Sequence, residues 1–105
     1  MLTSKNLQRE ISITITRKNL ANTDLMLSAL RRTISPQKIV SVGNLGAKIK
    51  FDEKDMDTSV KVVNVMRGVD IGDEDKIILV TRKDGLVESS VACDRPQLEK
   101  FLLAV

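Results

Sequence analysis

The stretch that decides the fold is residues 60–69, VKVVNVMRGV. Its valines favour a β-strand, because branching at Cβ restricts the side chain in a way that suits a pleated sheet. A second set of positions, three and four residues apart, lies instead on one helical face: Val62, Val65, Met66 and Val69. The local pattern therefore fits both a strand and a helix, and the flanking sequence has to decide between them.

Upstream, residues 10–17 (EISITITR) alternate isoleucine with serine or threonine. This period of two predicts a strand with an apolar face and a hydroxyl-bearing face. A helical period follows, for which Asn22 or Thr23 is the expected N-cap, with Asp24 in the first turn. Ser35-Pro36 should end this helix, because the residue before a proline disfavours the helical conformation.

Short apolar runs and turn residues then predict a series of strands. Residues 38–42 and 47–51 are expected to form a hairpin across a turn that contains two glycines. The run 76–81 is apolar enough for a central strand, and Asp84-Gly85 is a strong signal for a tight turn. Residues 86–92 are therefore expected to return as one more strand.

The last helix is the clearest in the chain. Asp94 and Gln97 have the spacing of a capping box, and Pro96 lies in the first turn, where its missing N–H costs nothing. The residues expected to line its apolar side are Leu98, Phe101, Leu102 and Val105.

Composition excludes several kinds of chemistry. The chain has no histidine, so histidine-dependent nucleophiles, bases and phosphocarriers are excluded. Cys93 is the only cysteine, so neither an internal disulfide nor a cluster of thiolate ligands can form. No apolar run has the roughly 20 residues that span a bilayer, so we expect a cytoplasmic protein that does not contact membrane. The size predicts one domain over 10–105, after a flexible tail over 1–9.

Charge is distributed unevenly along the chain. Residues 1–50 carry a net charge of +7 and residues 51–105 a net charge of −4. The basic residues that flank the first helix could form one edge able to contact nucleic acid: Arg17, Lys18, Arg31, Arg32 and Lys38. Aromatic residues that could stack on single-stranded bases are missing from this set, so the alternative is a small basic domain that contacts duplex phosphates.

Two groups of acidic residues lie in expected loops, at 52–57 and at 70–75. Either group could ligate a hard cation, but neither has the spacing of an EF-hand. Solvated loop charge is the favoured interpretation, so we expect no metal, no cofactor and no catalytic residue.

The order strand, helix, hairpin, valine-rich segment, strand and helix resembles the HPr family, the histidine-containing phosphocarriers of the sugar phosphotransferase system. The segment from Ile11–Ile15 to Asn19-Leu20-Ala21 is similar to the family's first strand and phosphorylation loop. Residues 62–71 are similar to its second helix and the segment after that helix, and 77–80 to its last strand. The resemblance covers about residues 10–82, and it implies that the valine-rich stretch is a helix.

The functional motif of that family does not carry over. Ala21 stands where the resemblance would place the phosphorylated histidine, so the chain should be unable to carry phosphohistidine. What the resemblance implies instead is a non-catalytic, regulatory or protein-binding module. The first two helices would then form its docking face, with Asn22, Asn64 and Arg67 as its exposed members. Met66 is a candidate apolar anchor for a partner, although methionine at helical spacing is more often a core residue.

Together these observations predict an α+β open-faced β-sandwich of the HPr-like type. An antiparallel sheet of four to five strands should be covered on one face by three helices. A protein partner is the expected ligand, with nucleic acid as the alternative.

Overall fold

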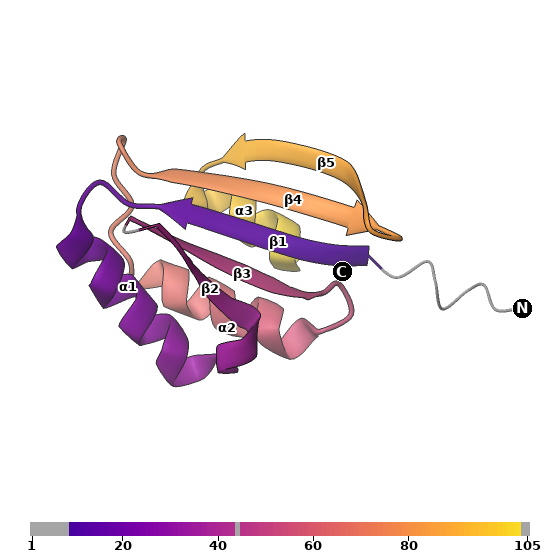
Figure 1. Ribbon diagram of the computed structural model, residues 1–105, viewed down its shortest axis with the longest axis horizontal. Helices are drawn as coiled ribbons and strands as arrows, with labels where there is room; N and C mark the ends of the chain where they lie inside the picture. The colour runs from indigo at the N-terminus through magenta and orange to yellow at the C-terminus, as the bar shows by residue number, and fades with distance from the viewer. Residues whose placement is uncertain (1–8, 44, 104–105) are drawn as a thin grey trace, which may run out of the picture.

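The valine-rich stretch is helical over most of its length in the computed structural model (Figure 1). The structure describes residues 9–43 and 45–103. In chain order the elements are β1 (Arg9–Thr16), α1 (Leu20–Thr33), a short 3-10 helix η2 (Pro36–Lys38), β2 (Ile39–Val42), β3 (Gly46–Asp52), α2 (Met56–Arg67), β4 (Lys76–Lys83), β5 (Leu86–Cys93) and α3 (Arg95–Leu103). The tail expected over residues 1–9 lies outside the described residues, except for Arg9.

All five strands form one antiparallel sheet in the order β2-β3-β1-β4-β5. β1 is central, so β3 lies between β1 and β2, and β1 lies between β3 and β4. The units β1-α1-β2 and β3-α2-β4 are therefore interleaved, which is the split β-α-β or ferredoxin-like arrangement. Figure 1 shows the three helices on one side of the sheet. The expected α+β open-faced sandwich is confirmed.

Burial explains why the valine-rich stretch forms a helix in spite of its β propensity. Val62, Val63 and Met66 are almost fully buried in the common core, where a helical face can cover the sheet. Asp55 caps the start of α2, and its carboxylate accepts the backbone N–H of Thr58 at 3.1 Å. The sequence offers Asp57, Thr58 and Ser59 as possible caps of this helix, so the observed cap lies two to four residues earlier than expected.

α1 also begins earlier than predicted. Its N-cap is Asn19, whose side chain accepts the backbone N–H of Asn22 at 2.9 Å. Thr23, one of the two expected caps, is buried inside the helix and donates its hydroxyl to the Asn19 carbonyl. The prediction that Asn22 or Thr23 is the N-cap was therefore wrong. The first turn contains no acidic residue, so Asp24 lies beyond the turn in which it was expected. Three neighbouring residues could each cap a helix, and local pattern does not choose among them.

The β4–β5 hairpin has the predicted two-residue turn. Asp84 and Gly85 have φ angles of 55° and 81°, the left-handed values that a type I′ turn requires. Beyond it, β5 extends the sheet by a fifth strand and pairs with β4, with a bulge opposite Thr81/Arg82. Its side chains are exposed on both faces, apart from the half-buried Cys93.

α3 has the predicted capping box. The Asp94 carboxylate accepts the Gln97 N–H at 2.8 Å, and the Gln97 side chain accepts the Asp94 N–H at 2.9 Å. Leu98 and Leu102 are buried, whereas Phe101 is 39% exposed and does not complete the expected apolar side. The fourth residue of that predicted set, Val105, lies outside the described residues.

An ion pair connects the last residue of η2 to the N-cap of α2. Lys38 Nζ lies 2.6 Å from the Asp55 carboxylate and 3.1 Å from the Thr58 hydroxyl. The hydrogen bond from Lys38 and those from the Thr58 hydroxyl and backbone lower the pKa of Asp55 to about 2. The charged form of Asp55 therefore stabilises the fold.

We predict that Asp55→Ala lowers the free energy of unfolding by about 1–2 kcal/mol at neutral pH, because it removes both cap and ion pair. Asp55→Asn keeps a good cap and should cost less. The folded pKa is below the unfolded value, so this contribution is present above about pH 4 and is lost as the pH falls towards 2. Urea titrations at several pH values measure it; a wild-type advantage over Asp55→Asn that persists at pH 2 would contradict it.

Candidate functional site

The structure brings together two of the four residues predicted for a docking face. Asn22 on α1 and Asn64 on α2 line the same groove between the two helices. Met66 is fully buried in the core and cannot contact a partner, so that prediction was wrong. Arg67 is exposed but lies outside the groove lining, and it forms an ion pair with Glu99 of α3 at 3.2 Å.

The groove has a volume of about 520 Å³, and five apolar and five polar or charged side chains line it. Met26 and Val69 form its buried floor, together with Ala29 and Val65 at intermediate exposure. Leu25 projects from α1 with 71% of its surface exposed. Sequence reasoning missed Leu25, because it is outside the apolar stripe that fixes α1 to the core.

Polar groups are placed along the groove in a definite order. Asn22, Arg17 and Asp70 line the end near the start of α1, and Arg32 lines the end near its last turn. The side-chain amides of Asn22 and Asn64 form no hydrogen bond to another residue within 9–43 or 45–103. The groove therefore offers free amide donors and acceptors beside an exposed leucine.

The Arg17 side chain is buried and forms part of the wall of this groove. Its Nε lies 3.3 Å from the Asp75 carboxylate, and both side chains are 5% exposed. Its Nη2 donates to the Asp70 carbonyl at 2.8 Å. Burial raises the pKa of Asp75, but backbone donors from Gly72 and Lys18, together with Arg17, outweigh it and hold that pKa below its usual value. Arg17 is thus structural and is not a free cation on a basic edge.

The predicted basic edge is largely neutralised by neighbouring carboxylates. Besides Arg17, Lys18 pairs with Glu74 at 3.0 Å and Lys38 pairs with Asp55 at 2.6 Å. Arg31 and Arg32 remain, and neither forms an ion pair with any residue that the structure describes. Within this predicted edge, the positive charge left for a ligand therefore lies at the last turn of α1, on Arg31 and Arg32.

The acidic residues do not assemble into a metal site. Over the described part of the chain, no group of three or more acidic or cysteine side chains is placed to hold a metal ion. Asp55 and Asp75 are engaged in the ion pairs described above, and Glu74 is paired with Lys18. Interactions within the fold account for these carboxylates.

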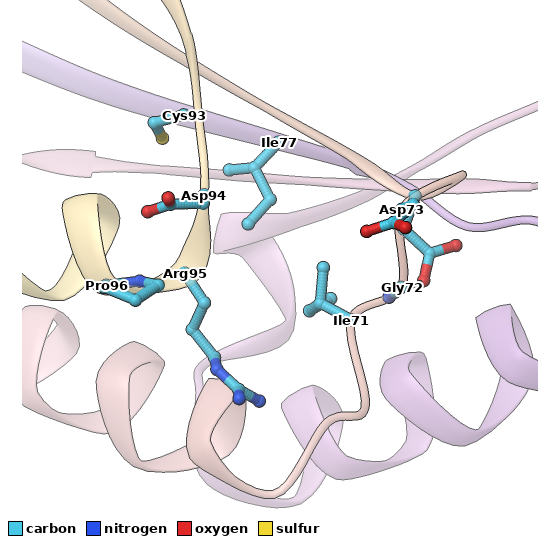
Figure 2. A pocket seen from close by; sticks show the side chains of 9 residues that line it. Ile71, Gly72, Asp73, Ile77, Cys93, Asp94, Arg95 and Pro96 are labelled. Carbon is cyan, nitrogen blue, oxygen red and sulfur yellow. Dashed lines mark hydrogen bonds between the residues drawn. The ribbon is translucent and has the colours of Figure 1, made fainter.

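A second hollow, of about 330 Å³, lies where β5 joins α3 (Figure 2). Most of its polar groups already have partners. Arg95 donates to the carbonyls of Met66 and Val69, at 3.3 and 2.5 Å, and so completes the end of α2. Asp94 is occupied as the cap of α3. Cys93 is the one nucleophile in this hollow, and burial, followed by the charge of Asp94, raises the pKa of its thiol.

Ala21, which stands at the position of the phosphocarrier histidine in the resemblance, is the second residue of α1. The backbone N–H groups of this first helical turn are partly used by the Asn19 cap. A methyl side chain at this position offers neither a nucleophile nor a proton acceptor.

Comparisons of the chain with protein families, with curated proteins and with solved structures found no match. Among the described residues, none of the helices combines the length and the apolar character needed to cross a bilayer. The candidate site therefore has to be interpreted from its own geometry, and the α1/α2 groove combines an exposed leucine with the unengaged amides of Asn22 and Asn64.

We predict that Cys93 reacts slowly with iodoacetamide at neutral pH, because a raised pKa leaves less of the reactive thiolate. The rate should still rise steeply through about pH 9, the ordinary value for a thiol. Mass spectrometry of the alkylated protein measures it, with the urea-unfolded chain as control. A rate that levels off below pH 9, or that equals the rate of the unfolded chain at neutral pH, would contradict the prediction.

Proposed function

We propose that this chain is a non-catalytic protein-interaction domain, and that the α1/α2 groove receives an amphipathic helix of its partner. The observation that carries the proposal is Leu25, which is 71% exposed above a groove with an apolar floor. Helix-in-groove recognition uses apolar anchors of this kind. A single exposed leucine is ordinary on a protein surface. Leu25, however, adjoins the apolar floor of the groove, and a continuous apolar patch of this kind marks an interaction site.

Charge gives the proposed partner helix a direction. Arg32 lies at one end of the groove with Arg31 beside it in the sequence, and Asp70 lies at the other end. α1 has 14 residues, about 21 Å, so the groove accommodates roughly four helical turns. A partner helix with carboxylates at one end and a basic residue at the other would complement both ends. Asn22 and Asn64 would satisfy polar groups between them.

The proposed relation to the sugar phosphotransferase system is a narrower version of this function. It is supported by the order of the elements and by the placement of Asn22 and Asn64 on α1 and α2, where the resemblance puts the docking face. The split β-α-β arrangement serves many unrelated functions, so the groove carries more of the argument than the likeness.

Nucleic-acid binding stays as an alternative with less support. Only Arg31 and Arg32 of the five basic residues in the predicted edge lack a carboxylate partner among the described residues. Four lysines of the sheet also lack an ion pair there and could contact phosphates: Lys48, Lys50, Lys76 and Lys83. Duplex affinity that falls with salt along a straight log–log line would favour this alternative over the groove.

We predict that a photo-crosslinking amino acid at position 25 captures a partner in cells, because Leu25 would be within the docking surface. Leu86, at the tip of the β4–β5 hairpin, is the matched control because it is also a leucine and is 74% exposed. Crosslinked products are identified by mass spectrometry.

The captured partner then provides a binding assay. Leu25→Lys should weaken its binding by tenfold or more, an effect of roughly 1.4 kcal/mol, while Leu86→Lys should leave it unchanged. Equal capture from both positions, or equal affinity of the two variants, would reject the groove as the docking surface.

We also predict that the chain takes up no label from phosphoenolpyruvate and the first enzyme of the phosphotransferase system, because the chain has no histidine to accept it. The same assay with Ala21→His tests the resemblance, because this variant has a histidine at the position where the family carries its phosphorylated one. Label on the unchanged protein would contradict the non-catalytic assignment.

A further inference from the structure

β5 is an edge strand, and its second half, residues 89–93, lacks the usual protection against pairing. It has eight residues, whereas β2, at the other edge of the sheet, has four. Figure 1 shows β5 as the outermost strand, and within residues 9–43 and 45–103 only β4 pairs with it. Exposed edges are normally blunted by shortness, charge, proline or a bulge. β2 is short, but β5 is long enough to receive another strand.

The charge along β5 is confined to the end near the hairpin. Glu88 is its only charged residue, and it is held by Arg9 through two hydrogen bonds of 2.6 and 3.2 Å. The bulge opposite Thr81/Arg82 lies at this same end. Residues 89–93, SSVAC, are regular and contain no charge, proline or glycine. This uncharged half of β5 exposes Val91, with 48% of its surface accessible.

We propose that the free edge of residues 89–93 pairs antiparallel with the same edge of a second copy of this chain. Two five-stranded sheets would then join into one continuous sheet of ten strands around a two-fold axis. The uncharged segment fits a copy of itself because no like charges meet, and an isologous contact closes after two subunits.

The register of this pairing follows from the faces of the strand. Ser89, Val91 and Cys93 pair with Thr81, Leu79 and Ile77 of β4, whose buried side chains point towards the helices. Ser90 and Ala92 therefore point to the open face. In a two-fold dimer, paired side chains must share a face. Centring the pair on Val91 meets this condition: Val91 faces Val91, Ser90 faces Ala92, and Ser89 faces Cys93.

Sedimentation at increasing protein concentration tests the association, and a monomer–dimer equilibrium is expected. Val91→Lys would place two ammonium groups opposite each other and should raise the dissociation constant by roughly tenfold or more. Val40→Lys on β2 is the matched control, because Val40 is also 48% exposed and lies on the opposite edge strand. This variant should dimerise like the wild type.

A disulfide tests the register independently. Ser89→Cys should form a covalent dimer under mild oxidation, through bonds between position 89 of one copy and Cys93 of the other. Within one chain these positions are four residues apart on a strand, about 13 Å, which is too far for a disulfide. Ser90→Cys is the control, because residue 90 faces away from Cys93 and should give little covalent dimer.

Wild type that stays monomeric at every concentration would overturn the proposal. So would a dimer that survives Val91→Lys, a mass that keeps growing beyond two copies, or equal crosslinking of the two cysteine variants. None of these outcomes depends on the groove, which lies between α1 and α2, so the two proposals fail separately.

Discussion

The structure depends on covering the isoleucines of β1. Ile13 and Ile15 are completely buried and Ile11 is nearly so. The strands on either side of β1 cover its edges but not its faces. The apolar face of β1 needs a layer of side chains from outside the sheet. The helices supply it, and Val62 and Met66 of α2 are part of that layer. The α-helical state of the valine-rich stretch is thus a consequence of burial in the tertiary fold, which outweighs local preference.

Elements with strong local signals could be predicted from the sequence. The alternation in β1, the Asp84-Gly85 turn and the capping box of α3 each depend on residues within a few positions of one another. The start of α1 could not be predicted, because Asn19, Asn22 and Thr23 offer similar capping oxygens. Only the path of the preceding chain shows that Asn19 is the one outside the helix.

Two of the residues predicted for the candidate site, Asn22 and Asn64, line the groove, and helix geometry explains why Met66 does not. Asn64 and Met66 are two positions apart, so they project about 200° from each other and cannot share a face. Assigning both to one docking surface was therefore inconsistent, and the structure assigns Met66 to the core. Arg17 is a different kind of miss. Its burial depends on Asp75, which is far along the chain, and no local pattern connects the two.

The central position of β1 has a consequence for biosynthesis. This strand is synthesised before both of its partners, β3, about 35 residues later, and β4, about 65 residues later. Its backbone hydrogen bonds to both neighbouring strands can form only after β4 has been made. Long-range pairing of this kind slows folding and exposes nascent chains to aggregation. The serine and threonine hydroxyls that alternate with the isoleucines keep β1 partly polar until β3 and β4 have been synthesised.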